Sequence, residues 1–178
     1  MTNHAARTAA VIEDLIRREG GYVFTNNPHD RGGPTFAGIT QRAWDRYRYD
    51  RLSAHAAAAL LPHEVRDLKP EHVRAFYATV HVEPFDWIED DRLHALLVDC
   101  GVLHGVARAV MWLQRAARVE EDSIMGRDTR KAVLTANSAE LHKRILSTRF
   151  DYIARIVKSD MSQALFLPGW IARCCEFL

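Results

Sequence analysis

Apolar residues recur at three- and four-residue steps through most of the chain, and this period constrains the fold more than any other feature. In the first segment Val11, Ile12, Leu15 and Ile16 follow this spacing, which is the pattern of one buried helix face. The exception is the stretch 19–40, where turn-forming residues separate two short runs of aromatic and β-branched residues. We therefore expect a mainly α-helical protein with one small β-hairpin.

The composition is that of a folded protein without an obvious membrane or nucleic-acid role. The 178 residues are 48% hydrophobic, which is enough to form a core, and the net charge of +1 argues against a dedicated nucleic-acid binder. No apolar run is long enough to cross a bilayer, and the N-terminal sequence has no apolar signal segment. We expect a protein without a transmembrane segment or signal peptide that first resides in the cytoplasm.

Positive charge is concentrated in one part of the chain. From Gly105 to Lys158 there are 11 Lys and Arg against 6 Asp and Glu, while the remainder holds 13 against 17. Such a segment either faces a polyanion, for example a cell wall, or forms an ordinary solvated helix surface.

Neither the cysteines nor the histidines follow a pattern that indicates a disulfide framework or a metal site. The three cysteines are Cys100, Cys174 and Cys175, an odd number with two neighbours in sequence. The nine histidines lack the H-E-x-x-H spacing of zinc enzymes. We expect unpaired thiols, no metal and no cofactor.

Several residues mark where helices begin. Pro70 suits the first turn of a helix, and Asp90 precedes a second one. Asn137 and Glu140 have the spacing of a capping box before a long helical segment over 141–157.

No internal repeat or linker divides the chain cleanly. The segment 62–70, bounded by two prolines, is the best candidate for a lobe boundary. We expect an N-terminal lobe over 1–68 and a helical lobe over 69–178, which together form one compact unit.

Glu19 ends the first apolar helix in an unusual setting. It lies on the same face as Ile12 and Ile16, where a carboxylate is poorly hydrated, and at the helix C-terminus, where the dipole disfavours negative charge. Both effects favour the protonated carboxyl group that a general acid needs. Gly20 and Gly21 then stop the helix, because glycine readily takes the left-handed conformation at a helix end.

The predicted hairpin after Glu19 brings Asp30 and Thr35 back towards this acid, and these residues supply a second carboxylate and a hydroxyl group. Two carboxyl groups that flank a sugar linkage are the basis of most glycosidases. A glutamate at a helix end is also commonly a solvated surface acid, and hydrogen bonds within a turn also account for an aspartate such as Asp30.

The stretch REGGYVFTNNPHDRGGPTFAGIT resembles the signature of the glycoside hydrolase family 108 muramidases, a phage-type lysozyme family. In that family a helix ends in E-G-G-Y and is followed by D-P-x-D-x-G-G-x-T and G-I-T. The matching positions in this chain are Glu19, Gly20, Gly21, Tyr22, Pro28, Asp30, Gly32, Gly33, Thr35, Gly38, Ile39 and Thr40. Asn27 replaces the first Asp of D-P-x-D, so the role of second acid falls on Asp30.

The resemblance continues more faintly beyond residue 45. FYATVHVEPFDWIEDDRLHALLVDCGVLHG is similar to the middle of the family, with Asp99 and Gly105 matching and Leu103 in place of the usual Asn. Within this segment we expect Asp99, which matches the family, and His104 to contact substrate.

The segment at about 97–135 is similar to the peptidoglycan-binding region associated with this family. Its L-Q and V-D-G-x-I-G-x-x-T pattern is matched at Leu113, Gln114, Asp122, Ile124, Gly126 and Thr129. Ser123 replaces the usual Gly, and GWIAR at 169–173 matches the C-terminal G-W-L-x-R of the family.

Taken as a family member, the chain is expected to be a monomeric endolysin with a lysozyme-like α+β fold. Its partner is bacterial peptidoglycan, and it cleaves the bond between N-acetylmuramic acid and N-acetylglucosamine. The resemblance assigns Glu19 as general acid, while Asp30 orients a water or stabilises the transition state and Thr35 positions that water. Tyr22 either lines a sugar subsite or packs in the core. Without an export signal, such an enzyme depends on a holin-like pore to reach the cell wall or periplasm.

Two other classes of function stay open. One is a catalytically weak cell-wall-binding or secretion-associated protein of the same fold, which the departures at Leu103 and Ser123 favour. The other is a helical nucleic-acid-binding protein that uses the basic segment 105–158, which the near-neutral net charge opposes.

Overall fold

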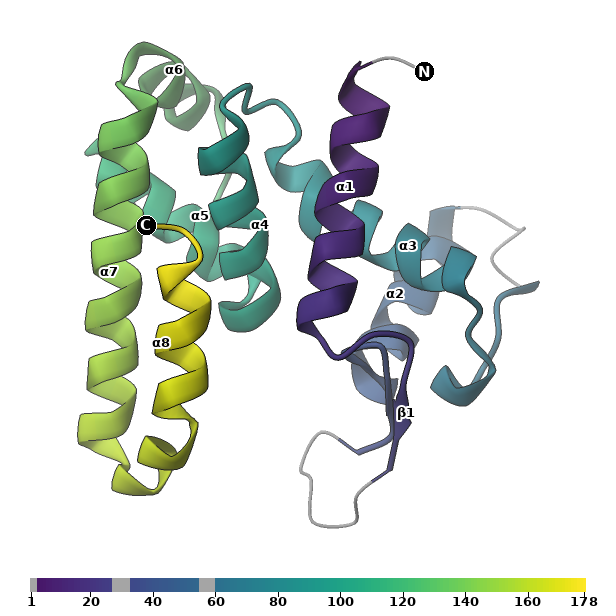
Figure 1. The fold of residues 1–178 in the computed structure, drawn as a ribbon. Coiled ribbons are helices and arrows are strands. Elements are labelled where there is room, and N and C mark those ends of the chain that lie inside the picture. Colours follow the sequence, from purple (N-terminus) through teal and green to yellow (C-terminus); the bar gives the residue numbers. More distant parts are fainter. Residues whose placement is uncertain (1–2, 27–32, 55–59) are drawn as a thin grey trace. The chain divides into compact units, whose positions relative to one another are not determined.

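Helices predominate in both units of the chain, which comprise residues 1–83 and 84–178 in the computed structural model (Figure 1). The structure describes residues 3–26, 33–54 and 60–178. No helix in these ranges has both the length and the apolar character needed to cross a membrane.

The first unit combines helices with a small sheet. Its elements are α1 (Asn3–Arg18), β1 (Phe24–Thr25), β2 (Thr35–Phe36), β3 (Ile39–Thr40), α2 (Gln41–Ala54), the 3-10 turn η2 (Val65–Asp67), α3 (Pro70–Tyr77) and the π-helical turn η3 (Ala78–Val82). The 3-10 turn η4 (Glu83–Phe85) spans the boundary to the second unit.

Helix α1 ends as the sequence predicts. Its apolar face buries Ile12 and Ile16, and the backbone then forms a Schellman motif. The N–H of Gly21 donates to the carbonyl of Ile16 at 2.8 Å, and the N–H of Gly20 donates to that of Arg17 at 3.2 Å. The φ angles of Gly20 and Gly21 are +91° and +76°, a region that favours glycine. The predicted role of this glycine pair as a helix stop is confirmed.

The three strands form an antiparallel sheet in the order β1-β2-β3. Phe24 pairs with Phe36, and Thr35 pairs with Thr40. The two-residue turn at 37–38 joins β2 to β3 with φ angles of +49° and +77°, positive at both positions as a type I′ turn requires. The predicted hairpin is present, and the run 35–40 is itself a second, tighter hairpin.

Aromatic side chains from α2 and α3 form much of the core of the first unit. Trp44 is completely buried, and its indole N–H donates to the carbonyl of Pro62 at 2.8 Å. Phe76 packs edge-on against Tyr47 and Tyr77, with ring centroids 5.4 and 5.6 Å apart. These contacts hold α2, α3 and the segment before α3 together.

The boundary between the units lies at 83/84, later than the position expected at 68/69. Helix α3 begins at Pro70, as predicted, and continues directly into η3. Because η3 packs against α1, this whole segment belongs to the first unit.

The second unit is built of helices. They are α4 (Asp91–His104), α5 (Val106–Ala117), α6 (Arg127–Thr135), α7 (Ser138–Ser159), the 3-10 helix η5 (Met161–Phe166) and α8 (Leu167–Cys175). Helix α7 is the longest and packs against α4, α5 and α8 (Figure 1). The predicted caps are confirmed: Asp90 accepts from the N–H of Leu93 at 2.8 Å, and Asn137 accepts from that of Glu140 at 3.1 Å.

One buried glutamine organises the connection from α5 to α6. The amide N–H₂ of Gln114 donates to Asp122 at 2.6 Å, to the carbonyl of Ile124 at 3.0 Å and to Thr129 at 3.2 Å. Its amide oxygen accepts from the N–H of Ser123 at 3.0 Å. These contacts give a structural reason for the L-Q and D-x-I-x-x-x-x-T spacing of Gln114, Asp122, Ile124 and Thr129 in this segment.

Candidate active site

Glu19 is the C-cap residue of α1, so the helix and the Schellman motif fix its backbone. Its N–H donates to the carbonyl of Leu15 at 2.9 Å, and its side chain is partly exposed. The two glycines that follow turn the chain from the helix into β1. The acid is therefore held by rigid structure on one side and remains accessible on the other.

The turn between β2 and β3 packs against this acid. A Cβ atom added to Gly38 would lie 2.9 Å from both Cβ and Cγ of Glu19, and 2.7 Å from the hydroxyl oxygen of Tyr77. That hydroxyl donates to the carbonyl of Ala37 at 2.8 Å, and both Tyr77 and Ala37 are 1% exposed. The position thus needs glycine for its φ of +77° and for the space that Glu19 occupies.

Thr35 belongs to the same small sheet. Its hydroxyl donates to the carbonyl of Gly33 at 3.0 Å, which leaves the hydroxyl oxygen able to accept a hydrogen bond. Asp30, the other predicted catalytic residue, lies outside the described residues, as does Asn27.

Tyr22 lies at the start of the sheet, on the surface of the first unit. It is 36% exposed, and its ring centroid is 6.4 Å from that of Phe36. The guanidinium of Arg74 lies 5.9 Å from the Tyr22 ring centroid and is itself paired with Glu13 at 2.6 Å. Desolvation, followed by the nearby Glu13 carboxylate, raises the pKa of Tyr22, so its hydroxyl is a neutral donor at physiological pH.

Asp99 belongs to the second unit, where it forms the centre of a buried ion cluster. Arg149 lies 2.7 Å from one carboxylate oxygen, while Arg173 lies 2.8 Å from the other through Nη2 and donates to it at 2.9 Å through Nε. Asp99 is 1% exposed and Arg149 is completely buried. Burial acts to raise the pKa of Asp99, but Arg173 and Arg149 outweigh it and lower the pKa below its ordinary value. The cluster ties α4, α7 and α8 together through charged partners within the protein.

His104 ends α4 and is enclosed by aromatic rings. Its ring centroid lies 5.1 Å from that of Trp112 and 5.3 Å from that of Tyr152. Burial, followed by the positive charges of Arg149 and Arg108, lowers the pKa of His104 to about 4. The imidazole is therefore neutral at physiological pH.

The predicted site residues are distributed over both units. Glu19, Tyr22 and Thr35 lie in the first unit, while Asp99 and His104 lie in the second. In the described ranges, no cluster of three or more His, Cys, Asp and Glu side chains has an arrangement able to hold a metal ion.

Sequence reasoning missed three residues that position the site or the cluster. Gly38 was recognised only as part of the G-I-T match, although its close approach to Glu19 explains why glycine occurs there. Tyr77 carries no signal beyond an aromatic residue on a helix. Arg149 did leave a signal, because it falls on the apolar stripe of α7 that includes Ile145 and Ile153, and a cation there needs a buried anion.

Two family models match consecutive regions of the chain. The family model described as Glycosyl hydrolase 108 matches residues 12–105, and the model described as Predicted Peptidoglycan domain matches residues 108–175. A search of curated proteins gave no match.

A solved structure titled "Structure of Brucella abortus SagA" has a similar fold. The TM-score is 0.72 at 22% sequence identity, and the match covers 97% of this chain and 92% of that chain. The expected fold class, mainly helical and lysozyme-like with a small β-hairpin, is confirmed. The chain belongs to the glycosyl hydrolase 108 family and is a peptidoglycan hydrolase with a peptidoglycan domain in its C-terminal half.

Proposed function

We propose that this chain is an N-acetylmuramidase that cleaves the glycosidic bond between N-acetylmuramic acid and N-acetylglucosamine, with Glu19 as general acid. The observation that carries the proposal is the setting of Glu19. It caps α1 within the hydrolase-family region, it is partly exposed, and Gly38 packs directly against its side chain. A carboxyl group whose backbone is fixed at a helix end and whose side chain packs on a tight turn suits proton transfer to a bound sugar.

In the proposed reaction the Glu19 carboxyl group gives its proton to the leaving glycosidic oxygen. Positive charge then develops at the anomeric carbon, as in other glycoside hydrolyses. Asp30 stabilises this charge or orients the attacking water, and the hydroxyl oxygen of Thr35 accepts a hydrogen bond from that water. The partly exposed ring of Tyr22 offers a flat apolar surface on which a sugar ring packs.

The residues of the second unit have a different place in the proposal. Because the carboxylate of Asp99 is already bound by two guanidinium groups, we assign it an indirect role in keeping α4, α7 and α8 together. His104, which is neutral and lies beside Trp112, keeps its proposed role in substrate contact.

The test compares wild type with Glu19→Gln on purified peptidoglycan, and the released fragments are identified by mass spectrometry. Glu71→Gln is a matched control, since it removes an exposed carboxylate from α3 in the same unit. We expect wild type and the control to release fragments with muramic acid at the reducing end. Glu19→Gln should fold normally and release none.

Two results would oppose this assignment. If Glu19→Gln released fragments at the wild-type rate, Glu19 would not be the general acid. Absence of release by every variant, with retained pelleting on the wall, would favour a cell-wall-binding protein without hydrolytic activity.

A further inference from the structure

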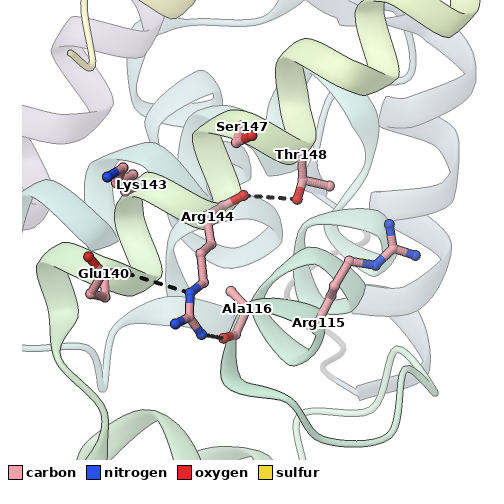
Figure 2. Close-up of a pocket in the computed structure, with 7 residues that line it drawn as sticks. All are labelled: Arg115, Ala116, Glu140, Lys143, Arg144, Ser147 and Thr148. Carbon is pink, nitrogen blue, oxygen red and sulfur yellow. Dashed lines mark hydrogen bonds and ion pairs between the residues drawn. The ribbon is translucent and has the colours of Figure 1, made fainter.

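An open groove of about 380 Å³ lies in the second unit, between the end of α5 and the N-terminal half of α7 (Figure 2). The residues that line it are Arg115, Ala116, Glu140, Lys143, Arg144, Ser147 and Thr148. The groove falls within the region matched by the peptidoglycan-domain model and plays no part in the chemistry proposed for Glu19.

The groove face of α7 is a polar stripe with helical spacing. Positions 140, 143, 144, 147 and 148 follow one another at three- and four-residue steps, so their side chains share one face. The opposite stripe, which includes Leu141, Ile145 and Ile153, is buried. The polar stripe is therefore a distinct surface of the helix.

The side chain of Arg144 reaches from α7 to the end of α5 (Figure 2). Its guanidinium donates to the carbonyl of Ala116 at 3.0 Å and lies 3.7 Å from the carboxylate of Glu140. Its own backbone carbonyl accepts from the hydroxyl of Thr148 at 2.8 Å. Arg115 is also held, by two contacts of 2.9 and 2.7 Å to the carboxylate of Glu121. Both arginines are thus ordered without a ligand, which lowers the entropic cost of binding one.

The ammonium group of Lys143 and the hydroxyl group of Ser147 are available to bind a ligand. Both side chains are exposed, and among the described residues neither has a hydrogen bond or an ion pair. They are four residues apart on the same face, so an ammonium and a hydroxyl lie one helical turn from each other. With Arg115 and Arg144 on the same lining, these two donors suit a carboxylate ligand.

We propose that this groove binds carboxylate groups of the peptide stems of peptidoglycan, with Lys143 and Ser147 as the direct contacts. This inference rests on the proposed function in that it takes peptidoglycan as the substrate. The lining holds three cations and the Glu140 carboxylate, and Glu121 pairs with Arg115 beside it, so one positive charge is left in excess. It contains no aromatic side chain, and sugar rings prefer aromatic platforms, so the charged peptide stems fit the groove better than the glycan strand does.

A pelleting assay on ice, before cleavage begins, tests the proposal with the full-length chain. The probes are purified peptidoglycan sacculi and the same sacculi after their free carboxylates have been converted to amides. The variant is Lys143→Glu, and the matched control is Lys158→Glu, the same change on the same helix about 22 Å away along the axis. Both lysines are exposed, and far-ultraviolet circular dichroism checks that the variants fold.

We expect Lys143→Glu to bind untreated sacculi on the order of tenfold more weakly than wild type, since it loses one charge-assisted contact and gains a repulsion. Amidation of the sacculi should weaken wild-type binding to a similar extent and should leave Lys143→Glu little affected. Lys158→Glu should bind like wild type, and Lys143→Arg should retain most of the affinity. Ser147→Ala should show a smaller loss than Lys143→Glu.

Equal binding of wild type and Lys143→Glu, or equal binding of wild type to amidated and untreated sacculi, would overturn the proposal. The proposal would also be overturned if Lys143→Glu weakened binding to duplex DNA but not to sacculi, because the groove would then bind phosphate groups. The release of sugar fragments is measured in parallel. If binding depends on Lys143 but no variant releases sugar fragments, the hydrolase proposal is wrong and the groove proposal is supported. If wild type releases sugar fragments but Lys143→Glu binds sacculi as wild type does, the groove proposal is wrong and the hydrolase proposal is supported.

Discussion

Gly38 packs so closely on Glu19 that a Cβ atom at this glycine would lie 2.9 Å from both Cβ and Cγ of the acid. The contact joins the tight turn between β2 and β3 to the end of α1. It gives the family-like motif a physical meaning, since E-G-G-Y and G-I-T form the two sides of one contact. The position of the acid therefore depends on the sheet as much as on the helix.

Gly38→Ala should lower hydrolytic activity because the new methyl group displaces the Glu19 side chain. A shift of about 1 Å in a catalytic group lowers kcat/KM by up to about a hundredfold, and we expect a loss between about tenfold and this limit. The φ of +77° adds strain of roughly 1–2 kcal/mol for alanine, so the protein should also unfold at lower denaturant concentration.

Gly105→Ala separates these two effects. Gly105 has a φ of +89°, but an added Cβ would meet no atom within 4 Å. It should lose stability through backbone strain alone and keep the activity of the folded protein. Equal activity in the two variants would show that the contact with Glu19 has no catalytic importance.

Tyr77→Phe should loosen the turn at 37–38 by removing its contact with Tyr77. The change removes the hydrogen bond to the carbonyl of Ala37 and leaves that buried carbonyl with one partner fewer, which costs about 1 kcal/mol in the free energy of unfolding. We expect a decrease in kcat with little change in KM, because the turn orients the acid and binds no sugar itself. Tyr49→Phe is the control, since Tyr49 is 74% exposed and should tolerate the same change in urea unfolding and in activity.

The parts of the fold that follow from local chemistry were predictable. The helix stop at Gly20 and Gly21, the start of α3 at Pro70 and the cap at Asn137 all depend on the preferences of single residues and on short spacings. The tight turn at 37–38 was harder, because Ala37 takes a positive φ that its residue type does not suggest.

The parts that depend on long-range contact were not predictable from the sequence alone. Tyr77 contacts Ala37 across 40 positions, and Arg173 reaches Asp99 across 74. Asp99 could be picked out as a family position, but its partners could not, because a single sequence carries no information about which distant cation meets a given carboxylate. The groove at Lys143 was visible only as a basic segment, since spacing on α7 does not show that α5 ends beside it.

The lowered pKa of His104 predicts that the protein loses stability in mild acid. Burial, followed by Arg149 and Arg108, lowers its pKa from 6.5 to about 4. Between pH 6.5 and about 4 the imidazole of His104 is protonated in the unfolded chain but stays neutral in the folded protein. The free energy of unfolding should therefore fall as the pH drops from 6.5 towards 4. His104→Phe keeps an aromatic ring between Trp112 and Tyr152 and should give a flatter slope in urea unfolding measured across this range.

The pH slope will not vanish in that variant, because burial also lowers the pKa of His142. A direct check is the NMR titration of the His104 imidazole in the wild type. Its resonances should keep their neutral-form positions until the pH approaches about 4. A midpoint close to 6.5 would contradict the proposed burial of the ring.

Ser123→Gly should stabilise the second unit. Ser123 has a φ of +65° and donates its backbone N–H to Gln114, so the network around Gln114 holds a non-glycine residue in the left-handed region. That conformation costs roughly 1–2 kcal/mol for a residue with a side chain, and the greater flexibility of glycine in the unfolded chain offsets about half of the gain. We expect a net increase of about 0.5–1 kcal/mol in the free energy of unfolding, measured by urea denaturation.

Ser123→Ala is the informative control for this prediction. It keeps a Cβ atom, and hence the strain, while it removes the hydroxyl group. If relief of backbone strain is the cause, only the glycine variant gains stability, and binding to peptidoglycan sacculi stays unchanged in both because the Gln114 contacts use the backbone at this position. A gain of equal size in Ser123→Ala would instead assign the cost to the hydroxyl group. In the first case the glycine of the family pattern is explained by backbone conformation, and the departure at Ser123 carries no argument against a functional peptidoglycan domain.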